Sequence, residues 1–219
     1  MSFRQKHDKR WQNYLLSGLA VLLLIFVLGA ACSQPQAPSE LPSSPPTSPQ
    51  TPPDSSAPPQ PAEWSADGVI SDGEYTKVAA YGDYEINWSS DEQYIYVGLK
   101  VKTTGWVAVG IQPGSKMKDA DMVLGAVEGG EAAVYDQFST GDFGPHKADT
   151  ELGGTNDILE FGGKEAGGYT IIEFKRALNT GDNYDHPLVK GANKIIWSYG
   201  SGDQTTIKHV NRGYGEIDL

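Results

Sequence analysis

The sequence predicts an all-β domain, an antiparallel β-sandwich of about nine to eleven strands with an immunoglobulin-like arrangement. Short segments with alternating or continuous apolar residues recur along residues 63–219, and clusters of turn residues separate them. The chain contains 26 glycines, which suit many tight turns. No segment shows a helical period over eleven residues. We therefore expect two packed sheets and almost no helix in this domain.

The first half of the domain carries the clearest strand patterns. Residues 84–88 and 94–101 alternate between apolar and polar side chains, which predicts strands with one buried face. Residues 105–111 form a continuous apolar run, Gly-Trp-Val-Ala-Val-Gly-Ile. Because this run does not alternate, it predicts a strand that is buried on both faces.

Strand patterns continue to the end of the chain. The remaining expected strands cover residues 121–127, 131–136, 157–161, 168–175, 194–199 and 216–219. The dipeptide Gly129-Gly130 lies between the first two of these strands and predicts a hairpin turn. A second Gly-rich turn separates the third strand of this set from the fourth.

Residues 1–32 predict a signal peptide or a membrane-anchoring helix rather than part of the fold. Four basic residues precede an apolar run at residues 14–31, so the N-terminus should stay in the cytoplasm and the rest be exported. The run ends Leu28-Gly-Ala-Ala-Cys32, which resembles a bacterial lipoprotein signal with Cys32 as the lipidated residue. Gly29 departs from that pattern, since Leu is common there. An uncleaved transmembrane helix is the alternative, and either segment holds the domain outside the cytoplasmic membrane.

Residues 33–62 predict a disordered Pro/Ser-rich linker between this segment and the domain. They contain 11 of the 14 prolines of the chain, and such a segment favours extended polyproline II over a packed core. Cys32 is the only cysteine, so the sequence excludes an intrachain disulfide and any metal site built on cysteine within residues 63–219.

The charge of the domain excludes two classes of partner. Residues 63–219 contain 13 Lys and Arg against 25 Asp and Glu, a net charge of −12. This argues against nucleic-acid binding and against direct docking on anionic lipid. A basic redox partner is compatible with it.

Several stretches between Trp64 and Leu219 resemble a DOMON domain, a β-sandwich module. The matching stretches are residues 67–75, 105–111, 117–125, 136–140, 174–182 and 209–213. They cover nearly the whole domain in the expected order. The resemblance implies a sandwich whose pocket between the sheets, in many members, holds a b-type haem between a Met and a His. Other members lack haem and are thought to bind sugars.

The resemblance implies that Met117 and His209 are the haem ligands, because they occupy the Met and His positions of the family. Met122 competes with Met117, although a Met inside an apolar strand is usually core packing. A lone His between Lys208 and Val210 would otherwise be an exposed loop residue. The chain lacks Cys-x-x-Cys-His, so any haem b must be held non-covalently.

Other residues offer weaker candidate sites. His146 and His186 are expected to be exposed or hydrogen-bonding residues of loops. A metal site could form if they meet carboxylates, for which the candidates are Asp149, Asp182 and Asp185. Asp119 and Asp121 could bind calcium together with loop carbonyls, although the chain has no D-x-[DN]-x-[DN]-G pattern.

We expect a membrane-tethered, extracytoplasmic electron carrier rather than an enzyme. A Met and a His together leave no open iron position for a substrate, and no G-x-S-x-G motif is present. The expected partner is a redox protein, either an exported dehydrogenase or a quinone-linked membrane protein. The alternative is a haem-free carbohydrate- or ligand-binding module. In that case sugars would stack on tryptophans, for which the candidates are Trp64, Trp88, Trp106 and Trp197.

Overall fold

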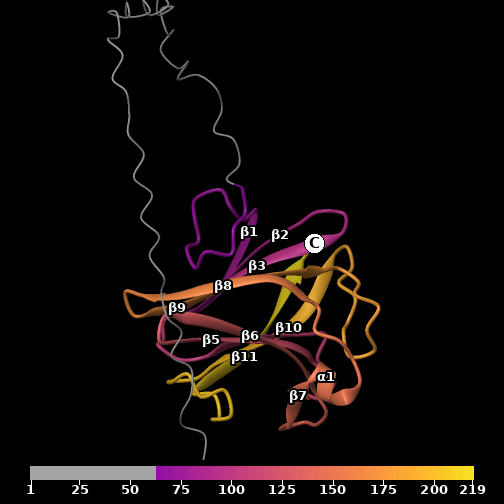
Figure 1. The fold of residues 1–219 in the computed structure, drawn as a ribbon. Coiled ribbons are helices and arrows are strands. Elements are labelled where there is room, and N and C mark those ends of the chain that lie inside the picture. Colours follow the sequence, from indigo (N-terminus) through magenta and orange to yellow (C-terminus); the bar gives the residue numbers. More distant parts are fainter. Residues whose placement is uncertain (1–62) are drawn as a thin grey trace, which may run out of the picture. The chain divides into compact units, whose positions relative to one another are not determined.

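A computed structural model describes residues 63–219 (Figure 1). The expected N-terminal helix, the lipidated Cys32 and the Pro-rich linker lie outside the described residues. Within residues 63–219, no helix has the length and apolar character needed to span a bilayer.

The described chain forms two antiparallel sheets that pack face to face, which confirms the predicted all-β sandwich. The five-stranded sheet has the order β1-β2-β3-β9-β8. Its strands are β1 (Lys77–Tyr81), β2 (Tyr84–Ser90), β3 (Tyr94–Val101), β8 (Ile158–Ala166) and β9 (Tyr169–Ala177). All of its strand pairs are antiparallel.

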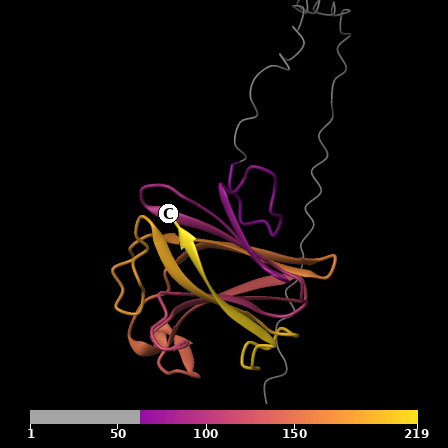
Figure 2. The same cartoon turned by 180° about the vertical axis from the view of Figure 1, so that it is seen from behind.

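The six-stranded sheet has the order β11-β10-β4-β5-β6-β7 and is also antiparallel. Its strands are β4 (Val107–Ile111), β5 (Asp121–Glu128), β6 (Glu131–Ser139), β7 (His146–Ala148), β10 (Ala192–Tyr199) and β11 (Asn211–Asp218). The paired strands β10 and β11 run side by side in the view from behind (Figure 2). The only helix of the described residues is the single turn α1 (Asp149–Leu152).

The main core fills the space between the two sheets. Alternate residues of β4, namely Val107, Val109 and Ile111, point into it together with Ile195 and Trp197 of β10. Each apolar side chain that is buried in this way contributes about 1.5–3 kcal/mol. The period of two along these strands is the reason why the alternating segments of the sequence were good indicators of strands.

A second, smaller apolar cluster lies on the opposite face of the six-stranded sheet. It consists of Trp106, Ala108, Leu124 and Ala126, all at most 5% exposed. All five residues of β4 are therefore buried, which confirms the prediction from the continuous apolar run. An outer sheet face can be buried only if other segments cover it, and here loops do so.

The predicted hairpin turns are also confirmed. Gly129 and Gly130 join β5 to β6 with φ of 62° and 89°, and Gly167 and Gly168 join β8 to β9 with φ of 61° and 82°. Two consecutive residues with positive φ are what a type I′ hairpin turn requires, and glycine adopts them without strain.

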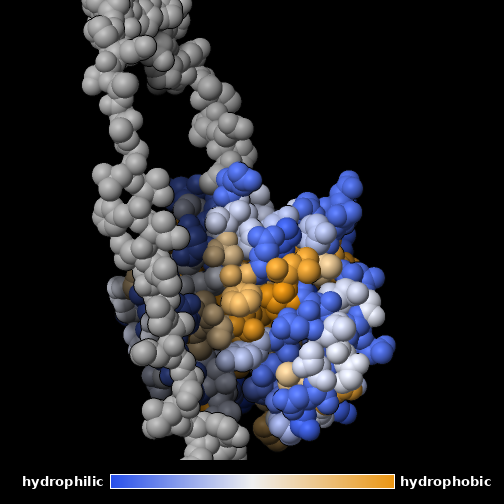
Figure 3. All heavy atoms as spheres, in the orientation of Figure 1, coloured by the Kyte–Doolittle hydropathy of each residue, from blue (hydrophilic) through white to orange (hydrophobic). Residues whose placement is uncertain are grey.

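On the face shown in Figure 3, most of the domain surface is hydrophilic, in agreement with its charge. Figure 3 shows one apolar area on the face seen in Figure 1. Strand β8, which crosses that face, carries the exposed side chains Leu159 and Phe161.

Candidate functional site

The candidate site lies on the outer face of the six-stranded sheet, where two rows of side chains cross four strands. In the first row Met122 of β5 pairs with Gly110 of β4, which pairs with Ile196 of β10, which pairs with Tyr214 of β11. The second row, two residues further along each strand, contains Leu124, Ala108, Ser198 and Arg212. Because residues two apart share a face, both rows point away from the main core.

A hollow lies over β10 on this face, where Ile196 and Ser198 line it. Ile196 also covers Gly110 of the neighbouring strand β4. A Cβ on Gly110 would lie 2.7 Å from Cγ1 of Ile196 and 3.3 Å from Cβ of Ala120, so no larger residue fits there. Ile196, Ser198 and Met122 therefore form the floor of the hollow.

The loop between β4 and β5 places Met117 at the edge of this hollow. The loop is closed by a backbone hydrogen bond of 2.8 Å from Gly114 N to Lys118 O. Gln112, Lys116 and Asp119 in this loop have positive φ of 47°, 55° and 61°, which costs a non-glycine residue on the order of 1–3 kcal/mol. Such backbone strain persists only where the surroundings impose it, and it is common at functional sites.

Contacts at the C-terminal end of the loop impose this conformation. Asp119 N donates to Ser139 O at 2.7 Å, and Ser139 N donates to Ala120 O at 2.9 Å. The ring of His186 adds a bond of 2.6 Å from Nε2 to Asp119 O, so this nitrogen carries the proton. His186 is thus a hydrogen-bonding loop residue, as predicted, and it helps to hold the Met117 loop in place.

The segment between β10 and β11 places His209 on the other side of the hollow. The buried Trp106 holds this segment, because its N donates to Gly202 O at 3.2 Å and its Nε1 donates to Ile207 O at 3.2 Å. A further bond of 2.9 Å runs from Val210 N to Tyr199 O. His209 itself is half-buried.

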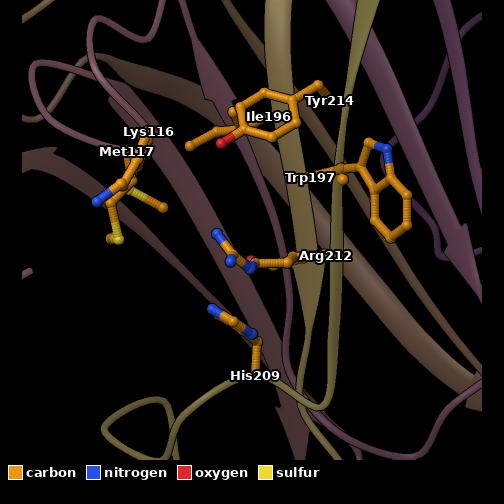
Figure 4. Close-up of a pocket in the computed structure, with 10 residues that line it drawn as sticks. Lys116, Met117, Ile196, Trp197, His209, Arg212 and Tyr214 are labelled. Carbon is orange, nitrogen blue, oxygen red and sulfur yellow. The ribbon is translucent and has the colours of Figure 1, made fainter. Parts of the chain in front are cut away.

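Met117 and His209 line the same cleft, although more than ninety residues separate them (Figure 4). The cleft consists of a larger part of about 590 Å³ and a smaller part of about 40 Å³, which share Met117, His209 and Arg212. The larger part lies in the volume range of ligand pockets, about 300–1,000 Å³. Trp106, Gln137 and Thr205 line it as well. The cleft lies outside the six-stranded sheet, so the expected pocket between the sheets is wrong for this chain, and the main core occupies that space.

Met122 lies closer to the site than its sequence position suggested. It is buried at 4% exposure, as expected for a Met in an apolar strand. However, it faces the outer side of the sheet and lines the same cleft as Met117. The cleft therefore contains two thioethers.

His146 is a second imidazole of the cleft. It lies in the short strand β7 rather than in a loop, and it is half-buried. Its Nδ1 lies 2.6 Å from Oε1 of Gln137. An amide oxygen accepts, so Nδ1 carries the proton and the free electron pair is on Nε2, the arrangement usual for a metal-binding His.

Both imidazoles of the cleft favour the neutral form that ligation needs. Burial lowers the pKa of His146. Burial also lowers the pKa of His209, and the positive charges of Arg212 and Lys208 lower it further. A soft thioether and a neutral imidazole are a donor pair that holds haem iron, so the residues of this cleft fit a b-type haem.

The metal sites suggested from the other His and Asp residues do not form as expected. Asp121 points into the interior, where both of its oxygens accept from Nη1 of Arg176 at 2.8–2.9 Å, while Asp119 is exposed. Among the described residues, the group with metal-like spacing is Asp121, Asp136 and Asp185, whose oxygens lie within 4.8 Å of one another. It includes neither histidine of the earlier hypothesis.

These three carboxylates belong to a buried acidic cluster with Asp149 around Arg176. Arg176 pairs with Asp121 at 2.8 Å and with Asp185 at 3.4 Å. Both oxygens of Asp149 are buried without a hydrogen-bond partner. Burial raises the pKa of Asp149 to about 8, that of Asp136 to about 7 and that of Asp185 to about 6. No sequence motif could have revealed this cluster, because its members come from separate segments.

The tryptophans offer little exposed surface for stacking on a sugar. Trp88, Trp106 and Trp197 are 5%, 4% and 8% exposed. Trp64 is partly buried and donates through Nε1 to the hydroxyl of Tyr75 at 2.9 Å. Of these four, Trp106 and Trp197 line the cleft, and both are held within packed clusters.

Comparison with protein families and curated proteins places the chain among known relatives. The model of the DOMON domain family matches residues 80–200. DBH-like monooxygenase protein 1 of Mus musculus is 30% identical over 122 residues, which are 56% of this chain and 19% of that protein. MOXD1 homolog 1 of Drosophila melanogaster is 34% identical over 131 residues, 56% of this chain and 18% of that protein. The chain spans about a fifth of the length of these relatives.

Two solved structures align with part of the chain. The cytochrome b domain of pyranose dehydrogenase from Coprinopsis cinerea aligns with a TM-score of 0.46 and 16% identity, covering 62% of this chain and 75% of that one. The cytochrome domain of Myriococcum thermophilum cellobiose dehydrogenase aligns with a TM-score of 0.46 and 11% identity, covering 62% of this chain and 74% of that one.

Proposed function

We propose, from the premise that this chain belongs to the DOMON domain family, that it binds one non-covalent b-type haem for electron transfer, and that Met117 and His209 are the residues that would hold its iron. The observation that carries the proposal is that these two side chains line one cleft. Its volume and its two neutral imidazoles support the assignment.

The haem supplies a one-electron redox centre when it is bound. The chain's own residues position the ligands: Ser139 and His186 hold the loop of Met117, and Trp106 holds the segment of His209. Ligation by a thioether and an imidazole would raise the reduction potential relative to ligation by histidine alone. Because both ligands come from the protein, we propose an electron carrier without catalytic activity of its own.

We further propose that the carrier is exported and tethered to the cell membrane, and that it exchanges electrons with a dehydrogenase or a quinone-linked membrane protein. The basic and apolar residues at positions 1–32 support the tether. The name of the Mus musculus relative refers to a monooxygenase, but the chain spans about a fifth of its length.

A titration of the full-length chain with haemin tests the proposal. We expect a Soret band that saturates at one haem per chain, and sharp α and β bands after reduction, which indicate low-spin iron. A wild-type chain that binds no haemin, or that binds it only in a high-spin form, would show the proposed function to be wrong.

Two matched pairs of variants identify the ligands. His209→Ala should abolish the low-spin spectrum, whereas His146→Ala, which removes the other imidazole of the cleft, should retain it. Met117→Leu should lower the reduction potential, whereas Met122→Leu should leave it near the wild-type value, since Leu is close to Met in volume. If His146→Ala or Met122→Leu has the larger effect, the ligand assignment is wrong while haem binding stands.

The second candidate function is a haem-free carbohydrate- or ligand-binding module. The hydroxyls of Thr205 and Thr206 and the amide of Gln137 line the cleft and could bond to a polar ligand. This function predicts quenching of tryptophan fluorescence by a glycan and no effect of Met117→Ala. A failed haemin titration together with such quenching would favour it.

A further inference from the structure

The cleft is a cationic site on an acidic domain. Lys208 and Arg212 line its larger part and Lys116 lines its smaller part, while residues 63–219 carry a net charge of −12. Asp142 is the only acidic side chain that lines the cleft together with them. Lys and Arg are otherwise a minority on this surface, so their gathering at the cleft indicates a ligand with negative charge.

The three cations differ in whether another group of the protein already pairs with their charge. Lys116 pairs with Asp142 at 3.7 Å, and its Nζ lies 3.8 Å from the ring centre of Phe143. Lys208 lies beside His209 on the exposed segment before β11. Arg212 forms no ion pair and no side-chain hydrogen bond with any of residues 63–219.

Arg212 also has the most central position. It stands in the second row on the sheet, opposite Ser198, and its side chain points into the space between Met117 and His209 (Figure 4). Its charge contributes to the lowered pKa of His209, which agrees with this proximity. A guanidinium remains charged at any physiological pH and presents its N–H groups in a fork that matches a carboxylate.

We propose that Arg212 is the carboxylate-binding residue of the cleft and makes it selective for a ligand that carries carboxylates on a planar apolar body. The proposal rests on the proposed function, because under that function the carboxylate is a propionate of haem b. It goes beyond that function by assigning ligand selectivity to a residue that does not touch the iron. A neutral sugar, one ligand class of the alternative function, has no carboxylate to pair with this charge.

Metal-free protoporphyrin IX and its dimethyl ester test the proposal independently of iron ligation. The two porphyrins have the same body, but only the first carries carboxylates. Each is titrated into the full-length chain, and porphyrin fluorescence gives the dissociation constant. We expect the wild type to prefer the diacid, and we expect a high salt concentration to weaken the diacid but not the ester.

Three variants separate Arg212 from the general charge of the surface. Arg212→Gln should weaken binding of the diacid about tenfold and leave the ester unchanged, as expected for loss of a charge-assisted hydrogen bond. Arg212→Lys should lie between, since it keeps the charge and loses the fork. Lys194→Gln is the matched control, because Lys194 is an exposed cation of β10 that does not line the cleft. It should bind both porphyrins as the wild type does.

The possible failures are distinguishable. Equal wild-type affinity for the two porphyrins, or equal losses in Arg212→Gln and Lys194→Gln, would overturn the role of Arg212 and leave haem binding intact. Selective binding of the diacid together with a high-spin haemin complex would support Arg212 and contradict Met117 and His209 as iron ligands. Failure to bind either porphyrin would overturn the role of Arg212, and the haemin titration would then decide the proposed function separately. Because Arg212 is exposed, Arg212→Gln should unfold at the wild-type temperature, which excludes misfolding as the cause.

Discussion

Replacing Asp149 by Asn should stabilise the domain at alkaline pH and reduce the dependence of its stability on pH. Asp149 is 1% exposed, neither of its oxygens has a partner, and its pKa is raised to about 8 by burial and then by Asp136 and Asp185. Asn has nearly the same shape and cannot ionise. The variant therefore removes a buried charge without creating a cavity.

The sign follows from proton binding. Between the unfolded pKa of 3.8 and the folded pKa of about 8, the folded state binds more protons than the unfolded state. The free energy of unfolding contributed by Asp149 thus falls as pH rises, by about 1.36 kcal/mol per pH unit. At pH 8 a lone group would cost about 5 kcal/mol. Because Asp136 and Asp185 share the proton uptake, we expect Asp149→Asn to gain about 2–4 kcal/mol at that pH.

Chemical unfolding of the full-length chain between pH 6.5 and 8.5 measures this effect. The window avoids lower pH, where His146 and His209, whose pKa values are lowered on folding, give stability that rises with pH. Asp83→Asn, a change at an exposed carboxylate between β1 and β2, is the control and should follow the wild type. A wild-type stability that is constant or rises across the window would refute the reasoning, since it would mean that the buried carboxylates are ionised and neutralised, for example by a bound cation.

Three other predictions concern the floor of the cleft, the buried ion pair and the tether. Gly110→Val should abolish haem binding, because its Cβ would lie 2.7 Å from Cγ1 of Ile196 and displace this residue, which lines the cleft. The circular dichroism spectrum should stay that of a β-protein, and retained affinity would show that the floor does not shape the site. Arg176→Met should lower the free energy of unfolding by about 3–5 kcal/mol at pH 8, because it leaves the buried carboxylate of Asp121 without its charge partner. Urea unfolding measures this change, and a decrease in the free energy of unfolding below about 1 kcal/mol would contradict the reasoning. Cys32→Ser should release the protein from the membrane fraction if Cys32 is lipidated, and unchanged membrane association would favour an uncleaved transmembrane helix.

The strands were predictable because their signals are local. Apolar residues alternate along β3 and form a continuous run along β4, and Gly129-Gly130 marks the turn after β5. Each pattern depends on residues that are neighbours along the chain and on whether one or both faces of the strand are buried. The resemblance to a family, carried by short motifs, also selected Met117 and His209. Both side chains line the cleft.

The position of the cleft was not predictable from local signals. Strand β4 is buried on both faces, and nothing in its sequence tells which face packs on the other sheet and which is covered by loops. That choice depends on strand register, which places Gly110 between Met122 and Ile196. The sequence of β5 likewise does not tell which face of the sheet Met122 occupies. It was therefore expected in the core, whereas it is found in the floor of the cleft.

By itself the sequence determined the all-β class, the turns, the acidic charge, and the absence of cysteine from residues 63–219, since each depends on residue type or on neighbours along the chain. Only the tertiary structure decided which polar groups meet. It brought His146 to the cleft of His209, and it gathered Asp149 with Asp185 inside the domain. Contacts between segments tens of residues apart depend on how sheets pair and pack, and no local pattern encodes that pairing.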